Sequence, residues 1–382
     1  MGVRRVLLVV MLVAALGCWP VVAWAAGSQP ERRTARGAIP AAAAVASVEA
    51  DFNNDGFADL AVGVPREGVG AAELAGAVNV LYGSTTGLSG SGSQLFFQGG
   101  GGVTDVAEPF DSFGAALAAG DFDNDGFVDL AIGVPGEDIQ TIPNAGAVNV
   151  LYGSTTGLSG AGGQFFSQDT TGVLGTPEPE DTFGAAVGAG DFDNDGFADL
   201  VIGVPAEDPG GAALAGAVNV LYGSAAKLTA AGNQQFVQGS GGVLGTAEIG
   251  DQFGFVLAGG DFNNDGFADL AIGAPFEDVG SVVDAGAINV LYGSAAKLTA
   301  TGNQQFVQGS GGVLGTAEIG DQFGFVLAGG DFDNDGFADR PSGRSAKTSA
   351  PPLMPGPSTS CMARRPGSPL PATSSSSRAT AA

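Results

Sequence analysis

The clearest pattern in the chain is the alternation of two kinds of residue over short segments that glycine brings to an end. In AGAVNVLYGS (145–154), Ala147, Asn149 and Leu151 alternate with Val148, Val150 and Tyr152. A period of two predicts a β-strand, and Gly153-Ser154 ends it. A shorter apolar run, DLAIGVP (129–135), predicts a second strand that ends at Pro135.

Two further segments complete a set of four. FGAALAAGDF (113–122) is rich in small and apolar residues, and we expect a fourth, outer strand around 164–168. Glycine, proline, serine and threonine separate the four segments. Beyond the N-terminal leader, no segment has the sustained i, i+3, i+4 spacing of an amphipathic helix. The pattern therefore predicts an all-β protein.

The whole unit repeats every 70 residues, marked by one acidic loop. Its copies are DFNNDGFAD (51–59), DFDNDGFVD (121–129), DFDNDGFAD (191–199), DFNNDGFAD (261–269) and DFDNDGFAD (331–339). A fixed period of this length indicates one supersecondary unit stacked several times. Four short strands per unit are typical of a β-propeller blade, whereas a solenoid coil needs only about 20–30 residues. We predict a β-propeller, with a sandwich or a solenoid as the alternative.

The acidic loop has the composition of a metal site. In the copy at 121–129, oxygen-bearing side chains fall at positions 1, 3, 5 and 9, which are Asp121, Asp123, Asp125 and Asp129. Gly126 permits a sharp turn, after which the carbonyl of Phe127 can face inward. Several hard oxygen donors favour Ca²⁺, whereas Mg²⁺ demands strict octahedral geometry.

Two observations limit this interpretation. Asn-Asp-Gly is also ordinary hairpin-turn chemistry, although a turn alone does not need Asp at both ends of five loops. The loop is not an EF-hand, because Ile132 stands where the bidentate Glu would be. Asn53 and Asn263 replace Asp at position 3, so we expect those two sites to bind calcium more weakly.

Charge and composition narrow the function further. The chain has 40 acidic and 14 basic residues, no histidine and a net charge of −26. Such a negative field repels nucleic acid and anionic membrane surfaces. Without histidine, the usual Ser–His and Cys–His nucleophiles and the common zinc sites are excluded. Paired carboxylates can cleave glycosides, but the loop pattern explains the acidic clusters, so we expect that the protein is not an enzyme.

The N-terminus has the features of an export signal. Arg4 and Arg5 precede the apolar run 6–16, and Ala23-Trp24-Ala25 offers a cleavage site. We predict a signal peptide at 1–25, a linker at 26–42 and a secreted, extracellular or cell-surface protein. A lipid anchor at Cys18 is the alternative, because Leu16-Gly17-Cys18 loosely resembles a lipidation box. No later segment has the ~20 apolar residues of a membrane span.

Taken together, these motifs resemble a known family. Phe-Gly pairs at 113–114, 183–184, 253–254 and 323–324 precede the acidic loop, and Gly-Val-Pro or Gly-Ala-Pro follows it at 133–135, 203–205 and 273–275. This combination is similar to the FG-GAP repeat, which builds the N-terminal β-propeller of integrin α chains and occurs in many bacterial exported proteins. The resemblance covers 43–339, with units near 43–110, 111–180, 181–250 and 251–320 and a partial unit at 321–339. Ala43-Ala44 replaces the first Phe-Gly, and the blades are fewer than the ideal seven, so the propeller is expected to be incomplete.

The resemblance implies calcium at up to five loops. The ligands that it implies are Asp51, Asn53, Asp55, Phe57 and Asp59; Asp121, Asp123, Asp125, Phe127 and Asp129; Asp191, Asp193, Asp195, Phe197 and Asp199; Asp261, Asn263, Asp265, Phe267 and Asp269; and Asp331, Asp333, Asp335, Phe337 and Asp339, each Phe through its carbonyl. It suggests a secreted, calcium-binding, non-enzymatic adhesion or recognition scaffold for an extracellular protein or glycan. The alternatives are the propeller remnant of a secreted hydrolase and a structural surface array without a specific ligand. The loops at 136–144, 206–213 and 276–284 vary most and are candidates for partner contact.

The C-terminal segment 340–382 departs from the repeat. It contains six basic residues and no acidic one, which is typical of a disordered tail. When LMPGPSTSCMAR (353–364) is read one base earlier with permitted codons, it yields DAGAVNVLYGS, whereas 284–294 is DAGAINVLYGS. We infer that a single-base deletion near codon 340 put a sixth unit out of frame.

The coding DNA tests this inference directly. We expect its alternative frame to encode AGAVNVLYGS about 70 residues after the copy at 285–294. Sequencing the region from an independent DNA preparation also separates a genuine deletion from a sequencing error. An alternative frame without that motif would show that 340–382 is a tail in its own right.

Overall fold

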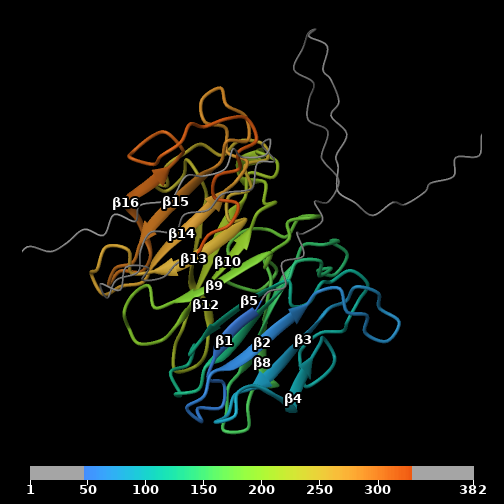
Figure 1. Cartoon of the computed structure of the whole chain (residues 1–382). Helices are drawn as coiled ribbons and strands as arrows, with labels where there is room; N and C mark the ends of the chain where they lie inside the picture. Colours follow the sequence, from blue (N-terminus) through green and yellow to red (C-terminus); the bar gives the residue numbers. More distant parts are fainter. Residues whose placement is uncertain (1–46, 329–382) are drawn as a thin grey trace, which may run out of the picture. The chain divides into compact units, whose positions relative to one another are not determined.

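The described residues form four antiparallel sheets of four strands each (Figure 1). The computed structural model describes residues 47–328. Within this range there is no α-helix, only the 3₁₀ turn η1 (Pro209–Gly211), and no helix that could cross a membrane. The predicted signal peptide (1–25), the linker (26–42), the fifth loop (331–339) and the tail (340–382) lie outside the described residues and stay predictions.

Each sheet is one blade, and its strands follow one another in chain order. The first blade contains β1 (Ser47–Ala50), β2 (Asp59–Val64), β3 (Ala77–Tyr82) and β4 (Ser89–Phe96). The second contains β5 (Ala116–Gly120), β6 (Asp129–Val134), β7 (Ala147–Tyr152) and β8 (Ser159–Phe166). The third contains β9 (Ala186–Gly190), β10 (Asp199–Val204), β11 (Ala217–Tyr222) and β12 (Thr229–Phe236). The fourth contains β13 (Val256–Gly260), β14 (Asp269–Ala274), β15 (Ala287–Tyr292) and β16 (Thr299–Phe306). This meander of short strands confirms the all-β, propeller-type prediction.

The fourth strand differs from its predicted position. β8 begins at Ser159 and ends at Phe166, whereas the sequence pattern placed a strand around 164–168. The pairing of β7 with β8 changes register between Val150 and Tyr152, which brings the glycine-rich segment 159–163 into the sheet. Hydrophobic alternation could not find this part of the strand, because glycine and small residues carry no such signal.

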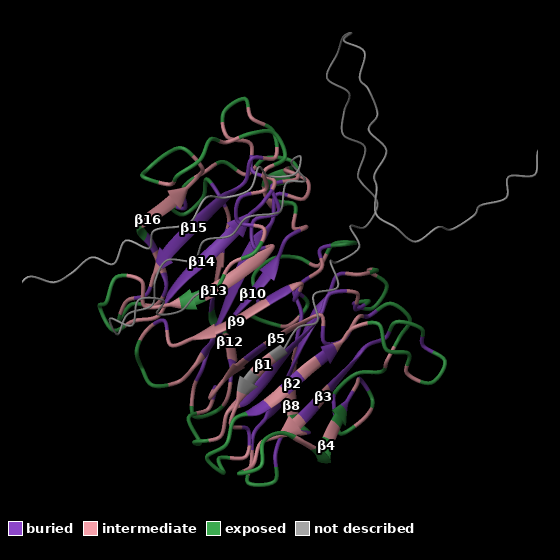
Figure 2. Cartoon of the chain, viewed as in Figure 1, coloured by how far each residue is buried: buried purple, intermediate pink, exposed green. Residues whose placement is uncertain are grey.

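The hydrophobic cores lie between neighbouring sheets. Val148, Val150 and Tyr152 of β7 pack in the core shared with the third blade. Leu151, on the opposite face of the same strand, packs in the core shared with the first blade. The alternation in 147–152 therefore separates two buried faces, and Figure 2 shows the middle strands β10, β14 and β15 of the third and fourth blades as mostly buried. β2 instead alternates between buried and half-buried residues, because among the described residues a sheet covers only one of its faces.

The Phe-Gly pair joins consecutive blades. The N–H of Phe113 donates a hydrogen bond to the carbonyl of Ala75 in the preceding blade at 2.8 Å, and its side chain is fully buried. A Cβ at Gly76 would lie 2.2 Å from the carbonyl oxygen of Phe113, so only glycine fits there. Gly114 donates its N–H to the carbonyl of Gly133 in its own blade at 3.0 Å, and a Cβ at Gly114 would lie 2.9 Å from the carbonyl oxygen of Ala77 in the preceding blade. The motif therefore places each blade against the one before it.

Buried carboxyl groups also join the blades. Glu137 of the second blade is 2% exposed and accepts a hydrogen bond from Gln98, which follows the first blade. The same pairs recur as Gln168–Glu207 and Gln238–Glu277. Burial raises the pKa of Glu137 to about 8. Burial also raises the pKa values of Asp111 to about 7 and of Asp181 and Asp251 to about 8.

These shifts predict how stability depends on pH. The unfolded carboxyls have pKa values near 4, so between about pH 4 and pH 8 the folded state binds more protons than the unfolded state. The free energy of unfolding of the metal-free protein should therefore fall as the pH rises from 5 to 8. Urea unfolding in EDTA measures this free energy. In the Glu137→Gln variant, its decrease between pH 5 and pH 8 should be smaller by roughly 1–3 kcal/mol. A protein that becomes more stable over this range would contradict the prediction.

Candidate metal centre

Each acidic loop joins the first and second strands of its blade. The loop at 121–129 starts directly after β5 and ends on the first residue of β6. The loops at 51–59, 191–199 and 261–269 have the same place in the other three blades. All four therefore lie at the same end of their sheets.

The first and fifth positions shape the loop. The carboxylate of Asp121 accepts the N–H of Asp125 at 3.1 Å and the N–H of Gly126 at 3.0 Å. The carboxylate of Asp125 accepts the N–H of Phe127 at 3.0 Å. Gly126 has φ of 91°, the left-handed region that favours glycine. These bonds curl the chain around its own carboxylates.

The ninth position anchors the loop to the sheet. Asp129 is fully buried, and its two oxygens accept the N–H of Phe122 and the N–H of Gly153, each at 2.9 Å. Gly153 directly follows β7, so one carboxylate connects the loop with the second and third strands. The equivalent bonds are Asp59–Gly83 at 2.8 Å, Asp199–Gly223 at 2.9 Å and Asp269–Gly293 at 2.9 Å. The sequence pattern marked this glycine only as the end of a strand.

The second and third blades bring three predicted donors together. Asp121, Asp123 and Asp129 each offer an oxygen, and these oxygens lie within 4.8 Å of one another. In the third blade the corresponding group is Asp191, Asp193 and Asp195. Asp125 and Asp199 lie outside these two groups, although both remain in their loops.

The first and fourth blades differ at position 3. Asn53 donates its amide to Asp55 at 3.1 Å, and Asn263 donates to Asp265 at 2.9 Å. Among the described residues, neither loop forms a group of three carboxylates. The carbonyls of Phe57, Phe127, Phe197 and Phe267 stay predicted ligands, as do all donors of the loop at 331–339.

The electrostatics of the loop fit a hard cation. One carboxylate oxygen of Asp123 is buried and has no hydrogen-bond partner, and the same holds for Asp193. Burial, with a contribution from neighbouring carboxylates, raises the pKa of Asp129 and of Asp199 to about 7 and that of Asp269 to about 6. A divalent cation would relieve both the desolvation and the repulsion. The donor set is oxygen only, which suits Ca²⁺ rather than metals with softer ligands.

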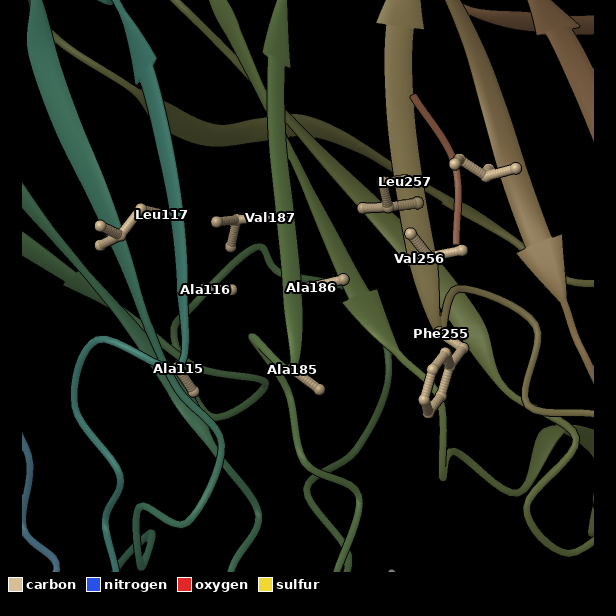
Figure 3. A pocket seen from close by; sticks show the side chains of 10 residues that line it. Ala115, Ala116, Leu117, Ala185, Ala186, Val187, Phe255, Val256 and Leu257 are labelled. Atoms are coloured by element: carbon tan, nitrogen blue, oxygen red, sulfur yellow. The ribbon is translucent and has the colours of Figure 1, made fainter. Parts of the chain in front are cut away.

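The inner strands line a separate, apolar hollow of about 400 Å³ (Figure 3). Leu117, Val187 and Leu257 come from β5, β9 and β13, and Phe255 directly precedes β13. All the lining side chains are apolar, so this hollow holds no acid, base or nucleophile. Among the described residues, the groups of three carboxylates that could hold a metal ion lie in the acidic loops.

Comparison with known proteins identifies the repeat. The FG-GAP repeat model matches residues 43–81, 113–151, 183–221 and 253–291. Rat phosphatidylinositol-glycan-specific phospholipase D is 35% identical over 173 residues, which are 45% of this chain and 20% of that protein. Integrin alpha pat-2 of Caenorhabditis briggsae is 30% identical over 249 residues, covering 60% of this chain and 17% of that protein. Integrin alpha-4 of Xenopus laevis is 32% identical over 167 residues, which are 44% of this chain and 14% of that protein.

These relatives correct one prediction. We expected that the protein is not an enzyme, but relatives from rat, cattle, mouse, human and Dictyostelium discoideum carry the name of a phospholipase. The expectation was wrong because it rested on the missing histidine and on the acidic clusters of the repeats. The chain spans only about a fifth of the length of these relatives, so the composition of the repeats does not decide whether a protein of this kind is an enzyme.

The matched segments start 70 residues apart and include all four described acidic loops. Each matched segment contains the first two strands and nearly all of the third strand of one blade, and the Phe-Gly pairs of the last three segments join consecutive blades. The chain is therefore an FG-GAP repeat protein, related to integrin α chains and to phosphatidylinositol-glycan-specific phospholipase D.

Proposed function

We propose that this protein is an exported propeller that binds Ca²⁺ at its acidic loops and uses the stiffened blades to recognise an extracellular protein or glycan. The observation that carries the proposal is the convergence of Asp121, Asp123 and Asp129, with one buried oxygen of Asp123 lacking a hydrogen-bond partner. Four carboxylates in one short loop need a counter-charge, and Ca²⁺ supplies it.

The chain's own residues give the ion a structural effect. Asp121, Asp123 and Asp129 would hold the ion, with Asp125 and the Phe127 carbonyl as further proposed donors. Asp129 is already bonded to the backbone at the start of its loop, through Phe122, and directly after β7, through Gly153. Calcium would therefore stiffen the loop together with the sheet rather than the loop alone.

The recognition role has two supports. Integrin α chains are among the relatives, and the N-terminal leader predicts export. The loops at 136–144, 206–213 and 276–284 connect the second and third strands, at the opposite end of the sheets from the acidic loops. They differ in sequence between blades of otherwise similar sequence, which suits them to contact a partner.

A second candidate function is favoured by the phospholipase relatives. In this case the propeller belongs with a secreted hydrolase and braces or directs its catalytic part. Two measurements separate the candidates: a binding screen against glycans and matrix proteins, with and without chelator, and an assay of phosphatidylinositol-glycan cleavage. Calcium-dependent retention without cleavage supports recognition, whereas cleavage supports the hydrolase.

Calcium should stabilise the fold measurably. We expect calorimetric titration to show uptake with Kd of about 10⁻⁴–10⁻³ M, as in extracellular calcium modules. At a calcium concentration ten times Kd, each site adds about 1.4 kcal/mol to the free energy of unfolding. Thermal melting in EDTA, in Mg²⁺ and in Ca²⁺ measures the gain. No heat of uptake together with equal melting temperatures would refute the calcium proposal.

Calcium uptake should also depend on pH. The raised pKa values of Asp129 and Asp199, both about 7, mean that protons compete with the metal below neutrality. We therefore expect affinity to rise between pH 6 and pH 8 and uptake at pH 6.5 to release protons. Calorimetry in buffers with different ionisation enthalpies counts those protons. Affinity that is constant over this range would argue against these two residues as ligands.

A further inference from the structure

The turn before the fourth strand of each blade contains one residue with left-handed backbone geometry. It is Gly87 in the first blade and Gly157 in the second, with φ of 92° and 95°. In the third and fourth blades it is Lys227 and Lys297, with φ of 80° and 82°. Glycine adopts this geometry freely, whereas lysine does so at a steric cost. Because lysine is strained at this position, we expect side-chain contacts that offset the cost.

Both lysines reach across to the preceding blade. The Nζ atom of Lys227 lies 3.5 Å from the centroid of the Tyr152 ring and donates a hydrogen bond to the carbonyl of Gly162 at 2.7 Å. The Nζ atom of Lys297 lies 3.6 Å from the centroid of the Tyr222 ring. A cation over an aromatic face is a favourable contact that also fixes where the charge sits.

The same turn is docked on the acidic loop of the preceding blade. Ser224, which begins the turn, donates its N–H to the carbonyl of Phe122 at 3.2 Å. Tyr152, under the lysine, is followed by Gly153, which is bonded to Asp129. Lys227 therefore places its positive charge in the turn that contacts this acidic loop.

The third and fourth blades repeat this contact. The N–H of Ser294 donates to the carbonyl of Phe192 at 3.0 Å, and Lys297 in this turn lies over the Tyr222 ring. In the second blade, Ser154 likewise donates to the carbonyl of Phe52 at 3.3 Å, but the turn ends in Gly157. In the second, third and fourth blades the turn therefore contacts the preceding loop, and its sequence changes from Ser-Thr-Thr-Gly at 154–157 to Ser-Ala-Ala-Lys at 224–227 and 294–297.

The lysine varies together with the charge of the loop that it faces. The loop opposite Gly157 has Asn53 at position 3 and three carboxylates. The loops opposite Lys227 and Lys297 have Asp at position 3 and four carboxylates. With the lysine included, the formal charge is −3 at each of the three loops.

We propose that Lys227 and Lys297 are built-in counter-cations that set the calcium affinity of the acidic loop in the preceding blade. The proposal rests on the calcium function proposed above. It replaces the expectation of two affinity classes: the loops at 51–59, 121–129 and 191–199 should bind calcium with similar affinity, because each lysine offsets the additional carboxylate.

A double-mutant cycle tests the charge pairing without metal. Lys227→Gln with Lys297→Gln keeps a hydrogen-bond donor but removes the charge, whereas Lys→Arg at both positions retains it. In EDTA we expect the Gln variant to melt a few degrees lower than wild type and the Arg variant to melt within about one degree of it. When Asp123→Asn and Asp193→Asn are also present, the loss from Lys→Gln should shrink to less than half.

Calcium titration of the same variants tests the effect on the ion. The Gln variant should bind about two- to fivefold more tightly at two of its sites, and the Asn variant more weakly by a similar factor. Combining both changes should restore the wild-type isotherm, and the remaining loops serve as an internal reference. Saturating calcium should also remove most of the melting difference between wild type and the Gln variant.

The outcomes separate the two proposals. A wild-type protein that takes up no calcium would overturn the calcium function and, with it, the tuning by lysine. Calcium uptake with unchanged affinity in the Gln and Asn variants would overturn the tuning alone. A melting loss that is equal in EDTA and in calcium, and independent of Asp123 and Asp193, would show that the lysines only hold the blades together.

Discussion

The fold depends on one buried carboxylate in each blade, the last residue of the acidic loop. Asp129 bonds to the backbone at the start of its loop and at the end of β7, while it lies beside the carboxylates of Asp121 and Asp123. A buried carboxylate is stable only when it is hydrogen-bonded, protonated or paired with a cation. The same residue therefore connects the architecture of the blade with the chemistry of its loop.

Packing between blades follows from the repeat in the same way. No blade can bury both faces of its middle strands alone, so each shares a core with its neighbours. The Phe-Gly pair, the Gln–Glu pair and the turn before the fourth strand all cross from one blade to the next. We therefore expect a change of charge or of bound metal at one acidic loop to alter the stability of the adjoining interface between blades.

Much of the fold could be predicted from the sequence, because alternation and the 70-residue period report directly on buried faces and stacked units. The strand at 147–152 and its two faces were found in this way. The glycine-rich start of β8 was not, since it carries no hydrophobic signal. The roles of Gly153 and Lys227 depend on contacts with another strand and another blade, which spacing along the chain does not encode. The expectation that the protein is not an enzyme was wrong because it was drawn from the repeats alone, and the chain covers only 20% of the rat phospholipase relative.

A crystal structure of the protein grown in calcium, with anomalous data that distinguish Ca²⁺ from water, tests the central claim most directly. The account predicts an ion in the loop at 121–129, ligated by Asp121, Asp123 and Asp129 at 2.3–2.6 Å, while Asp129 keeps its bond to Gly153. Loops that contain only water in millimolar calcium, with Asp123 unchanged and still unpaired, would contradict it.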